Sequence, residues 1–191
     1  MNRSWAWLKP LPELASIHTV VFDFDGVFTD NKVWVAEDGK ESVRCDRGDG
    51  LAFDLVRAFQ RDGKISAEFF ILSKETNPVV LSRAKKIRLT CHHGIRDKLF
   101  FMEEYLALRF PESSAPFEGL IYFGNDLNDL PIMRRAGYAV APADAHHMVR
   151  AIAHFVLEQR GGEGCVRAFI EKLLMIDKYS EEEMDELISN C

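Results

Sequence analysis

Three short apolar runs in the sequence are each followed at once by side chains that can bind a cation or a phosphate. These side chains are Asp23 and Asp25, then Ser73, then Asn125, Asp126 and Asp129. Clustered carboxylates repel one another unless a cation is present, and oxygen ligands favour a hard ion such as Mg²⁺. Lys98 would neutralise phosphoryl oxygens, and Ser73 would donate a hydrogen bond to them. An Asp carboxylate, kept ionised by a pKa that the metal and Lys98 lower, would then attack phosphorus as a nucleophile.

These side chains meet only if the apolar runs are neighbouring strands of one sheet. The runs at 20–22, 69–72 and 120–123 are continuously apolar, which is typical of parallel strands buried on both faces. Apolar residues at helical spacing lie between them: Leu51, Leu55 and Phe59; Val80, Ala84 and Ile87; Leu99, Met102 and Leu106. This alternation predicts an α/β fold with right-handed crossovers, in which ligands bind beyond the carboxyl ends of the strands.

Residues 31–46 break the alternation and predict a β-hairpin directly after the first strand. Asp38 and Gly39 are a turn signal between β-prone runs at 32–36 and 40–45. The hairpin is therefore an insertion in the layered fold rather than one of its strands.

The composition is that of a globular protein and argues against several functions. The chain has 191 residues, of which 47% are hydrophobic and 28% charged, and this predicts a single domain over residues 1–191. A formal net charge of −6 argues against nucleic acid as a partner. The four cysteines are dispersed, charges and prolines interrupt the N-terminal stretch, and no apolar run reaches about 18 residues. These features indicate a cytoplasmic protein that does not cross a membrane.

The motif sequences resemble those of one enzyme family. Residues 23–30, DFDGVFTD, are similar to the DxDGxxTD signature of haloacid dehalogenase-type phosphatases. Ser73, Lys98 and residues 124–129, GNDLND, resemble that family's second, third and fourth motifs, in the family's order. The resemblance implies a Rossmann-like parallel sheet sandwiched by helices, Mg²⁺ as cofactor, and hydrolysis of a phosphomonoester through an aspartyl-phosphate.

The resemblance also implies a role for each motif residue. Asp23 would be the nucleophile and a metal ligand, while Asp25 would act as acid and then as base, with its backbone carbonyl on the metal. The family's fourth motif commonly begins Gly-Asp, whereas Asn125 holds that place here. Either Asn125 binds the metal through its amide oxygen, or Asp126 does. Asp129 would orient the motif lysine or a metal-bound water, or else stabilise a helix N-terminus.

The lengths between the motifs leave no room for a cap domain. A folded cap needs roughly 50 residues or more, and only the hairpin and one helix fill residues 31–64. The resemblance is to the cap-less branch of the family, which implies a homotetramer whose neighbouring subunits cover the site. The hairpin would be the oligomerisation device, and a glycine-rich tail in residues 161–191 would reach a neighbour's site.

Residues 73–80, SKETNPVV, together with Arg83, suggest a substrate class. They resemble cap-less phosphatases of nine-carbon 2-keto-3-deoxy sugar acids, such as N-acylneuraminate and KDN 9-phosphates, and the phosphatase module of acylneuraminate cytidylyltransferases. Glu75 would accept hydrogen bonds from hydroxyls, while Arg83 and Arg47 would pair with a carboxylate. Arg83 lies only loosely on the active-site face of its helix and is equally consistent with a position facing an adjacent subunit.

Two other functions stay open. A KDO 8-phosphate phosphatase is one, although that branch usually carries Thr-Gly-Arg where this chain has Ser-Lys-Glu at residues 73–75. The other is a catalytically weak module that regulates or assembles an acylneuraminate cytidylyltransferase. The intact set of Asp23, Asp25, Ser73 and Lys98 favours an active enzyme over the second alternative.

Overall fold

The computed structural model describes residues 9–189 and is built around a six-stranded parallel sheet. The strand order is β5-β4-β1-β6-β7-β8. The strands are β1 (Thr19–Phe22), β4 (Glu68–Leu72), β5 (Thr90–His92), β6 (Leu120–Phe123), β7 (Tyr138–Ala141) and β8 (Phe155–Val156). The three apolar runs form β1, β4 and β6, and β1 pairs with β4 on one side and β6 on the other. The predicted α/β class is confirmed.

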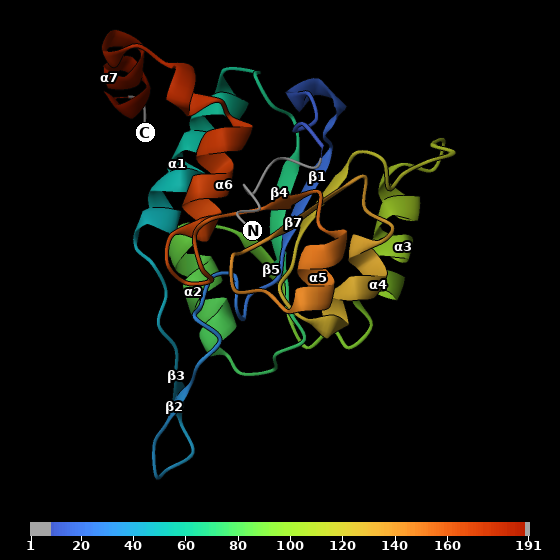
Figure 1. Ribbon diagram of the computed structural model, residues 1–191, viewed down its shortest axis with the longest axis vertical. Coiled ribbons are helices and arrows are strands. Elements are labelled where there is room, and N and C mark those ends of the chain that lie inside the picture. Colours follow the sequence, from blue (N-terminus) through green and yellow to red (C-terminus); the bar gives the residue numbers. More distant parts are fainter. Residues whose placement is uncertain (1–8, 190–191) are drawn as a thin grey trace, which may run out of the picture.

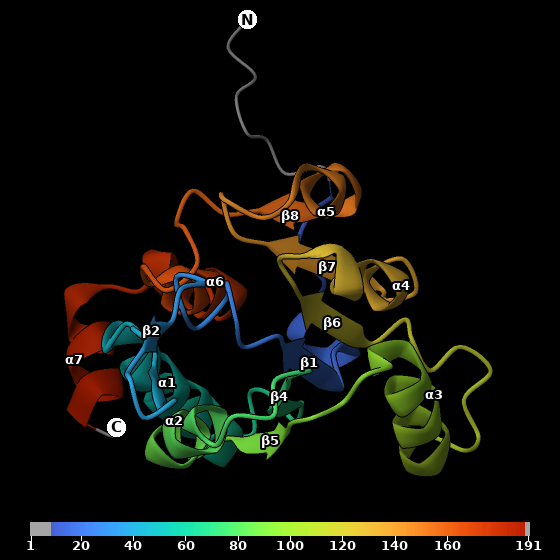
Figure 2. The same ribbon diagram turned by 90° about the horizontal axis from the view of Figure 1, so that it is seen from below.

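Helices cover both faces of this sheet (Figures 1 and 2). One layer contains α1 (Gly48–Arg61), α2 (Val79–Ile87), α6 (Cys165–Leu173) and, outside α1, α7 (Glu181–Ser189). The other layer contains α3 (Lys98–Arg109), α4 (Leu130–Met133) and α5 (His147–Ile152). Short 3-10 turns lie at η1 (Leu14–Ser16), η2 (Leu127–Asp129) and η3 (Ile176–Lys178).

The core has two parts because successive strand residues point to opposite faces. Phe22 packs edge-on against Phe53 of α1 and Phe169 of α6 on one side. Val21 belongs to the cluster on the other side, together with Met102 of α3. Both clusters contain residues that are almost fully buried, so the central strands are held rigidly and their carboxyl ends provide a fixed platform.

The predicted hairpin is present but much shorter than the sequence suggested. It consists of β2 (Trp34–Val35) and β3 (Glu41–Ser42), which pair antiparallel. Gly39 has φ = 78° in the connecting turn, which explains the glycine there. The hairpin projects away from the body of the molecule in Figure 1. Within residues 9–189 no folded cap domain accompanies it.

Candidate active site

The pairing of β4, β1 and β6 brings the first, second and fourth motifs to one edge of the sheet. Asp23 follows β1 directly, and its backbone N–H donates to the carbonyl of Phe123 at the end of β6, with an N···O distance of 2.8 Å. A cavity of about 530 Å³ opens over this edge. Its lining residues are Asp23, Asp25, Asn31, Ser73, Lys74, Glu75, Thr76, Asn125, Asp126, Leu127 and Asn128.

Lys98 joins two carboxylates beneath this cavity. Its Nζ lies 2.8 Å from Oδ1 of Asp23 and 2.8 Å from Oδ1 of Asp129. The side chains of Lys98, Asp23 and Asp129 are only 2%, 7% and 0% exposed. Burial alone would lower the pKa of Lys98, but the two carboxylates raise it above its usual value. The ammonium is therefore charged and holds the Asp23 carboxylate in place.

Asp129 holds in place both Lys98 and the loop that follows β6. Its Oδ1 accepts a hydrogen bond from the Tyr122 hydroxyl at 2.8 Å, and its Oδ2 accepts from the backbone N–H groups of Asn125 and Asp126. A Cβ on Gly124 would approach the Asp129 Cβ to 2.6 Å, so this close packing requires glycine. The sequence signalled Asp129 but not Tyr122, whose hydroxyl was hidden inside an otherwise apolar run.

The pKa of Asp23 differs from the sequence expectation. Burial and the neighbouring Asp129 raise it to about 7, although Lys98 and the Phe24 N–H oppose the rise. The sequence predicted a low pKa for this carboxyl. The physical reason for the difference is that two carboxylates share one ammonium in a site shielded from water. The protein alone therefore leaves this corner short of positive charge, which a bound cation would supply.

Asp25 lies in a tight loop that starts at the end of β1. Gly26 follows it with φ = 75°, and the Thr29 hydroxyl accepts the N–H of Gly26 at 3.2 Å, which closes the loop. Burial and then Glu75 raise the pKa of Asp25, while Lys98 and Thr29 lower it. A carboxyl with a raised pKa close to Asp23 is suited to proton transfer.

Asn125 and Asp126 occupy different environments. Asn125 is 7% exposed, and its Oδ1 is buried with no hydrogen-bond partner among residues 9–189. A Cβ on Gly26 would collide with the Asn125 amide, so the two residues are in direct contact. Asp126 instead caps the η2 turn, with its Oδ1 accepting the N–H of Leu127 at 2.7 Å.

The oxygen donors at this edge fit a magnesium ion although they do not include three carboxylates. Among residues 9–189, no three His, Cys, Asp or Glu side chains are placed to hold a metal. The orphaned Oδ1 of Asn125 beside Asp23 adds an uncharged oxygen ligand of the kind Mg²⁺ accepts. An unsatisfied buried acceptor is costly, and a cation would satisfy it.

Ser73 and Glu75 form the opposite wall. Ser73 is 1% exposed, lines the cavity, and accepts the backbone N–H of Glu75 with its hydroxyl oxygen at 3.1 Å. The hydroxyl proton remains available to a ligand. Oε1 of Glu75 accepts the N–H groups of Thr76 and Asn77, which fixes the carboxylate at the rim.

Arg47 and Arg83 lie apart from the other predicted site residues. Both line a second cavity of about 400 Å³ between α1 and α2, together with Arg57, Lys86 and Arg88. Arg83 Nη2 donates to the carbonyl of Asp46, and its Nε is buried without a partner among the described residues. Neither arginine lines the cavity over Asp23, so their role in substrate binding remains a prediction.

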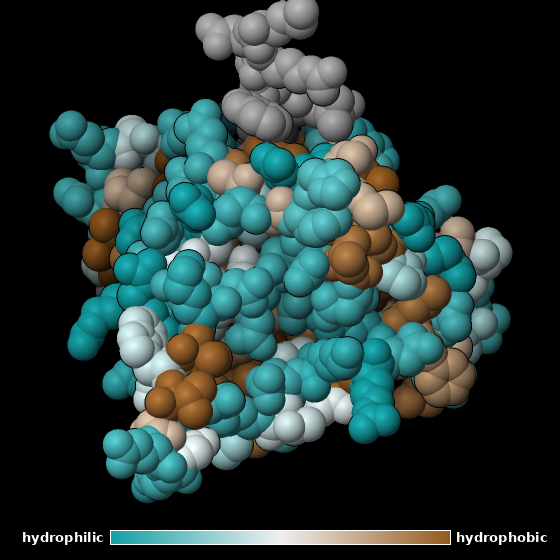
Figure 3. Space-filling model, turned by 60° about the horizontal axis from the view of Figure 1, so that its bottom comes forward, coloured by the Kyte–Doolittle hydropathy of each residue, from teal (hydrophilic) through white to brown (hydrophobic). Residues whose placement is uncertain are grey.

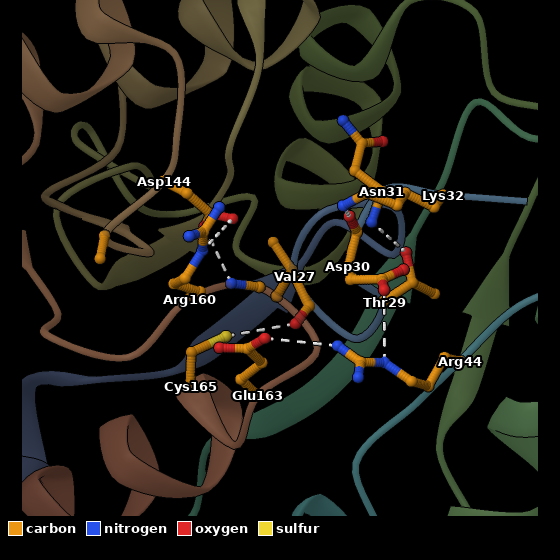
Figure 4. Close-up of polar contacts among 12 residues, drawn as sticks. Val27, Thr29, Asp30, Asn31, Lys32, Arg44, Asp144, Arg160, Glu163 and Cys165 are labelled. Carbon is orange, nitrogen blue, oxygen red and sulfur yellow. Dashed lines mark hydrogen bonds and ion pairs between the residues drawn. The ribbon is translucent and has the colours of Figure 1, made fainter.

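The glycine-rich segment lies against the chain's own first motif. Gly162 donates its N–H to the carbonyl of Val27 at 3.0 Å, and the Cys165 thiol donates to the same oxygen. Figure 4 shows the contact between Cys165 and Val27 together with Arg44, which bridges Asp30 and Glu163. A Cβ on Gly161 or Gly162 would collide with the backbone of residues 26–30. This segment was expected to reach a neighbour's site. In the chain itself it braces the loop that carries Asp25, because only glycine permits this approach.

The face around the site is mostly polar. Figure 3 shows hydrophilic side chains over its centre and apolar ones gathered at the lower left. The hairpin contributes Val33, Trp34 and Val35, which are 53%, 58% and 63% exposed. No helix within residues 9–189 combines the length and the apolarity needed to cross a bilayer.

Comparison with known proteins points to one group of hydrolases. A family model described as haloacid dehalogenase-like hydrolase matches residues 112–169, which include the loop after β6. A structure from Streptomyces avermitilis, assigned to the HAD family of hydrolases, is 36% identical, covers 91% of this chain and 95% of its own, and superimposes with a TM-score of 0.78.

Two further relatives have names that indicate phosphatases. The structure of a probable YrbI-family phosphatase from Pseudomonas syringae is 31% identical, covers 91% of this chain and 93% of its own, and has a TM-score of 0.76. A 3-deoxy-D-manno-octulosonate 8-phosphate phosphatase from Yersinia pestis is 29% identical over 84% of this chain and 81% of its own length.

Proposed function

This chain belongs to the haloacid dehalogenase superfamily of hydrolases, and on that premise we propose that it is a Mg²⁺-dependent phosphatase of a phosphorylated 2-keto-3-deoxy sugar acid. One observation carries the proposal. The buried ammonium of Lys98 lies 2.8 Å from Asp23 at the floor of a polar cavity, which fixes a carboxylate facing a space large enough for a phosphate.

In the first step Asp23 attacks phosphorus. A bond forms between its carboxylate oxygen and phosphorus, the ester bond to the sugar oxygen breaks, and the raised-pKa carboxyl of Asp25 gives its proton to the leaving oxygen. Lys98 and the Ser73 hydroxyl stabilise the charge on the transferring group. A bound Mg²⁺ would neutralise phosphoryl oxygens, and Asp23, the Asp25 carbonyl and Asn125 Oδ1 would hold it.

In the second step the aspartyl-phosphate on Asp23 is hydrolysed. Asp25, now a carboxylate, accepts a proton from the incoming water, whose oxygen attacks phosphorus. The bond to Asp23 breaks and inorganic phosphate leaves. Asp129 keeps Lys98 oriented throughout, since its Oδ1 contacts Nζ at 2.8 Å, and it thereby acts as a positioning residue.

The named relatives favour an eight-carbon substrate over the nine-carbon acids suggested by the sequence. The Yersinia relative is named for 3-deoxy-D-manno-octulosonate (KDO) 8-phosphate, and we take this as the first candidate substrate. Residues 73–80, SKETNPVV, are the one observation that favours N-acylneuraminate or KDN 9-phosphate as the second. Glu75, fixed at the rim of the cavity, suits the hydroxyls of either sugar acid.

We further propose that copies of this chain assemble, as a homotetramer, to complete the site. The exposed Val33, Trp34 and Val35 supply an apolar surface for such contact. Arg47 and Arg83 would then bind the substrate carboxylate from a neighbouring copy, which is consistent with their place in a basic cavity away from Asp23. A small sugar-acid phosphate and other copies of this chain are the partners we propose.

Phosphate release from a panel of sugar phosphates tests the function. KDO 8-phosphate, KDN 9-phosphate and N-acetylneuraminate 9-phosphate are compared with and without Mg²⁺. Hydrolysis of a sugar-acid phosphate that excess EDTA abolishes supports the proposal. A protein that releases no phosphate from any of them, yet changes the rate of an acylneuraminate cytidylyltransferase, would support a regulatory module instead.

A further inference from the structure

Asn31 has an unusual backbone conformation at the edge of the active-site cavity. Its φ is 60°, in the left-handed region that favours glycine. Its side chain lines the cavity together with Asp23 and Asp25. Asparagine tolerates this conformation better than most residues, so a plain turn role is the first explanation to consider. Glycine would fill that role with less strain.

The loop that carries Asp25 also holds Asn31 in place. The Thr29 hydroxyl accepts the N–H of Gly26 at 3.2 Å and the N–H of Asn31 at 3.1 Å. One oxygen thus closes the loop and holds Asn31 next to Asp25. Because Asp25 protonates the leaving oxygen in the proposed mechanism, the alcohol released there lies within reach of Asn31.

The Asn31 amide is free to bind a ligand. Among residues 9–189 it has no hydrogen-bond partner, and Figure 4 shows it directed away from the Asp30–Arg44 ion pair. The carboxylates of Glu75 and Glu41 act on Asp25 and can only accept hydrogen bonds, while the ammonium of Lys98, which also acts on Asp25, is already paired with Asp23 and Asp129. A hydroxyl both donates and accepts, so a polyhydroxylated alcohol bound here needs a donor that adds no charge. The amide nitrogen of Asn31 provides one.

We propose that the side-chain amide of Asn31 binds a hydroxyl of the leaving group and sets the preference for polyhydroxylated phosphomonoesters. This inference rests on the proposed function, since it concerns the alcohol side of the same reaction. Sites built to hydrogen-bond a substrate hydroxyl discriminate strongly against analogues that lack it. The prediction is therefore a change in selectivity rather than a general loss of activity.

The test compares kcat/KM of the wild type and Asn31→Gly on two substrates. KDO 8-phosphate has hydroxyls near the phosphate, and p-nitrophenyl phosphate has none. The variant should lower kcat/KM for KDO 8-phosphate by about 5- to 10-fold, the effect of one neutral hydrogen bond, mainly through KM. Its kcat/KM for p-nitrophenyl phosphate should stay within about twofold of the wild type, because that substrate never used the amide.

A second variant and a melting experiment separate contact from loop geometry. Asn31→Asp keeps the size and tolerates the left-handed conformation but removes the amide donor, so it should lower KDO 8-phosphate hydrolysis at least as much. Glycine is compatible with the backbone here, so the Tm of Asn31→Gly should change by only a few degrees. Equal losses on both substrates would overturn the inference, because they would show that Asn31 only positions Asp25.

The outcomes also distinguish this inference from the proposed function. A wild type that prefers KDO 8-phosphate, with the same preference in Asn31→Gly, overturns the role of Asn31 and leaves the function standing. A wild type that cleaves p-nitrophenyl phosphate but shows no preference for hydroxylated sugar-acid phosphates contradicts the proposed substrate class, and the role of Asn31 fails with it.

Discussion

The cluster of Asp23, Lys98 and Asp129 and the β2–β3 hairpin differ in how many partners the chain itself gives to their side chains. In the cluster every charged group has a partner at 2.8 Å, and the lysine side chain is 2% exposed. In the hairpin Trp34 is 58% exposed, and only two residue pairs join the strands. The chain therefore positions the charged side chains of the cluster by itself and leaves the apolar surface of the hairpin uncovered.

Replacing Asp23, the proposed nucleophile in the buried cluster, is expected to have the largest effect on activity. Asp23→Asn keeps the shape and an oxygen that can accept the N–H of Phe24, but it removes the attacking carboxylate. We expect kcat to fall by about 10³-fold or more, measured as phosphate release with KDO 8-phosphate. Turnover within tenfold of the wild type would show that another residue carries the phosphoryl group.

Removing the shared ammonium should damage folding as well as catalysis. Lys98→Met leaves Asp23 and Asp129 buried next to each other without a counter-charge. We expect the free energy of unfolding to fall by about 3–5 kcal/mol, measured by urea denaturation. The matched control is the double variant Lys98→Met/Asp129→Asn, which should recover part of this loss because one charge is removed. Additive losses would refute the charge-sharing account.

Asp49, a buried carboxyl outside both regions, should show a pH-dependent effect of intermediate size. It lies at the start of α1 near the hairpin, accepts the N–H of Arg167 in α6, and is fully buried. Burial raises its pKa to about 7, although the hydrogen bond from Arg167 opposes the rise. The folded state therefore keeps this proton up to about pH 7, whereas an unfolded Asp releases it near pH 4. Stability should fall as pH rises through that window.

The variant Asp49→Asn removes this titration and keeps an oxygen acceptor for Arg167. As pH rises from 5 to 8, the wild type should lose on the order of 2 kcal/mol of unfolding free energy relative to this variant. Urea denaturation at several pH values measures the difference. Parallel pH profiles for the two proteins would show that Asp49 is ionised in the fold throughout.

The smallest effect on the isolated chain is expected in the hairpin. Trp34 has few contacts to lose, so Trp34→Ala should change the unfolding free energy of the monomer by about 0.5 kcal/mol or less. Its effect should instead be on assembly, measured by light scattering, and on KM. A wild type that stays monomeric at all concentrations would contradict the proposed role of the hairpin in assembly, because its exposed surface would then have no partner copy to cover it.

The meeting of the candidate site residues was predictable from the sequence where each of them directly follows a strand. Continuous apolar runs that end in polar residues fixed the positions of Asp23, Ser73 and Asn125, because parallel strands share one carboxyl edge. Lys98 was found at the start of a helix and meets Asp23 there. The apolar run of β1 could be recognised because both of its faces are buried.

What the sequence missed depends on contacts between distant segments. Tyr122 was predicted only as a residue of a strand, because its hydrogen bond to Asp129 forms when the loop after β6 folds back onto that strand. The second cavity, which Arg83 lines, was not foreseen, because it depends on how α1 and α2 pack; the substrate-binding role of Arg83 stays a prediction. The close contact of Gly162 with Val27 joins residues that are far apart in the chain. A local sequence pattern cannot predict contacts that form only when distant segments pack together.

Chemical trapping can show whether Asp23 carries the phosphoryl group during turnover. Sodium borohydride reduces an acyl phosphate on aspartate to homoserine, which mass spectrometry locates in the peptide. With KDO 8-phosphate and Mg²⁺ under single-turnover conditions, homoserine should form at position 23, and it should be absent without substrate and in Asp23→Asn. Substrate turnover accompanied by homoserine at a different position, or by no trapped residue, would contradict the account.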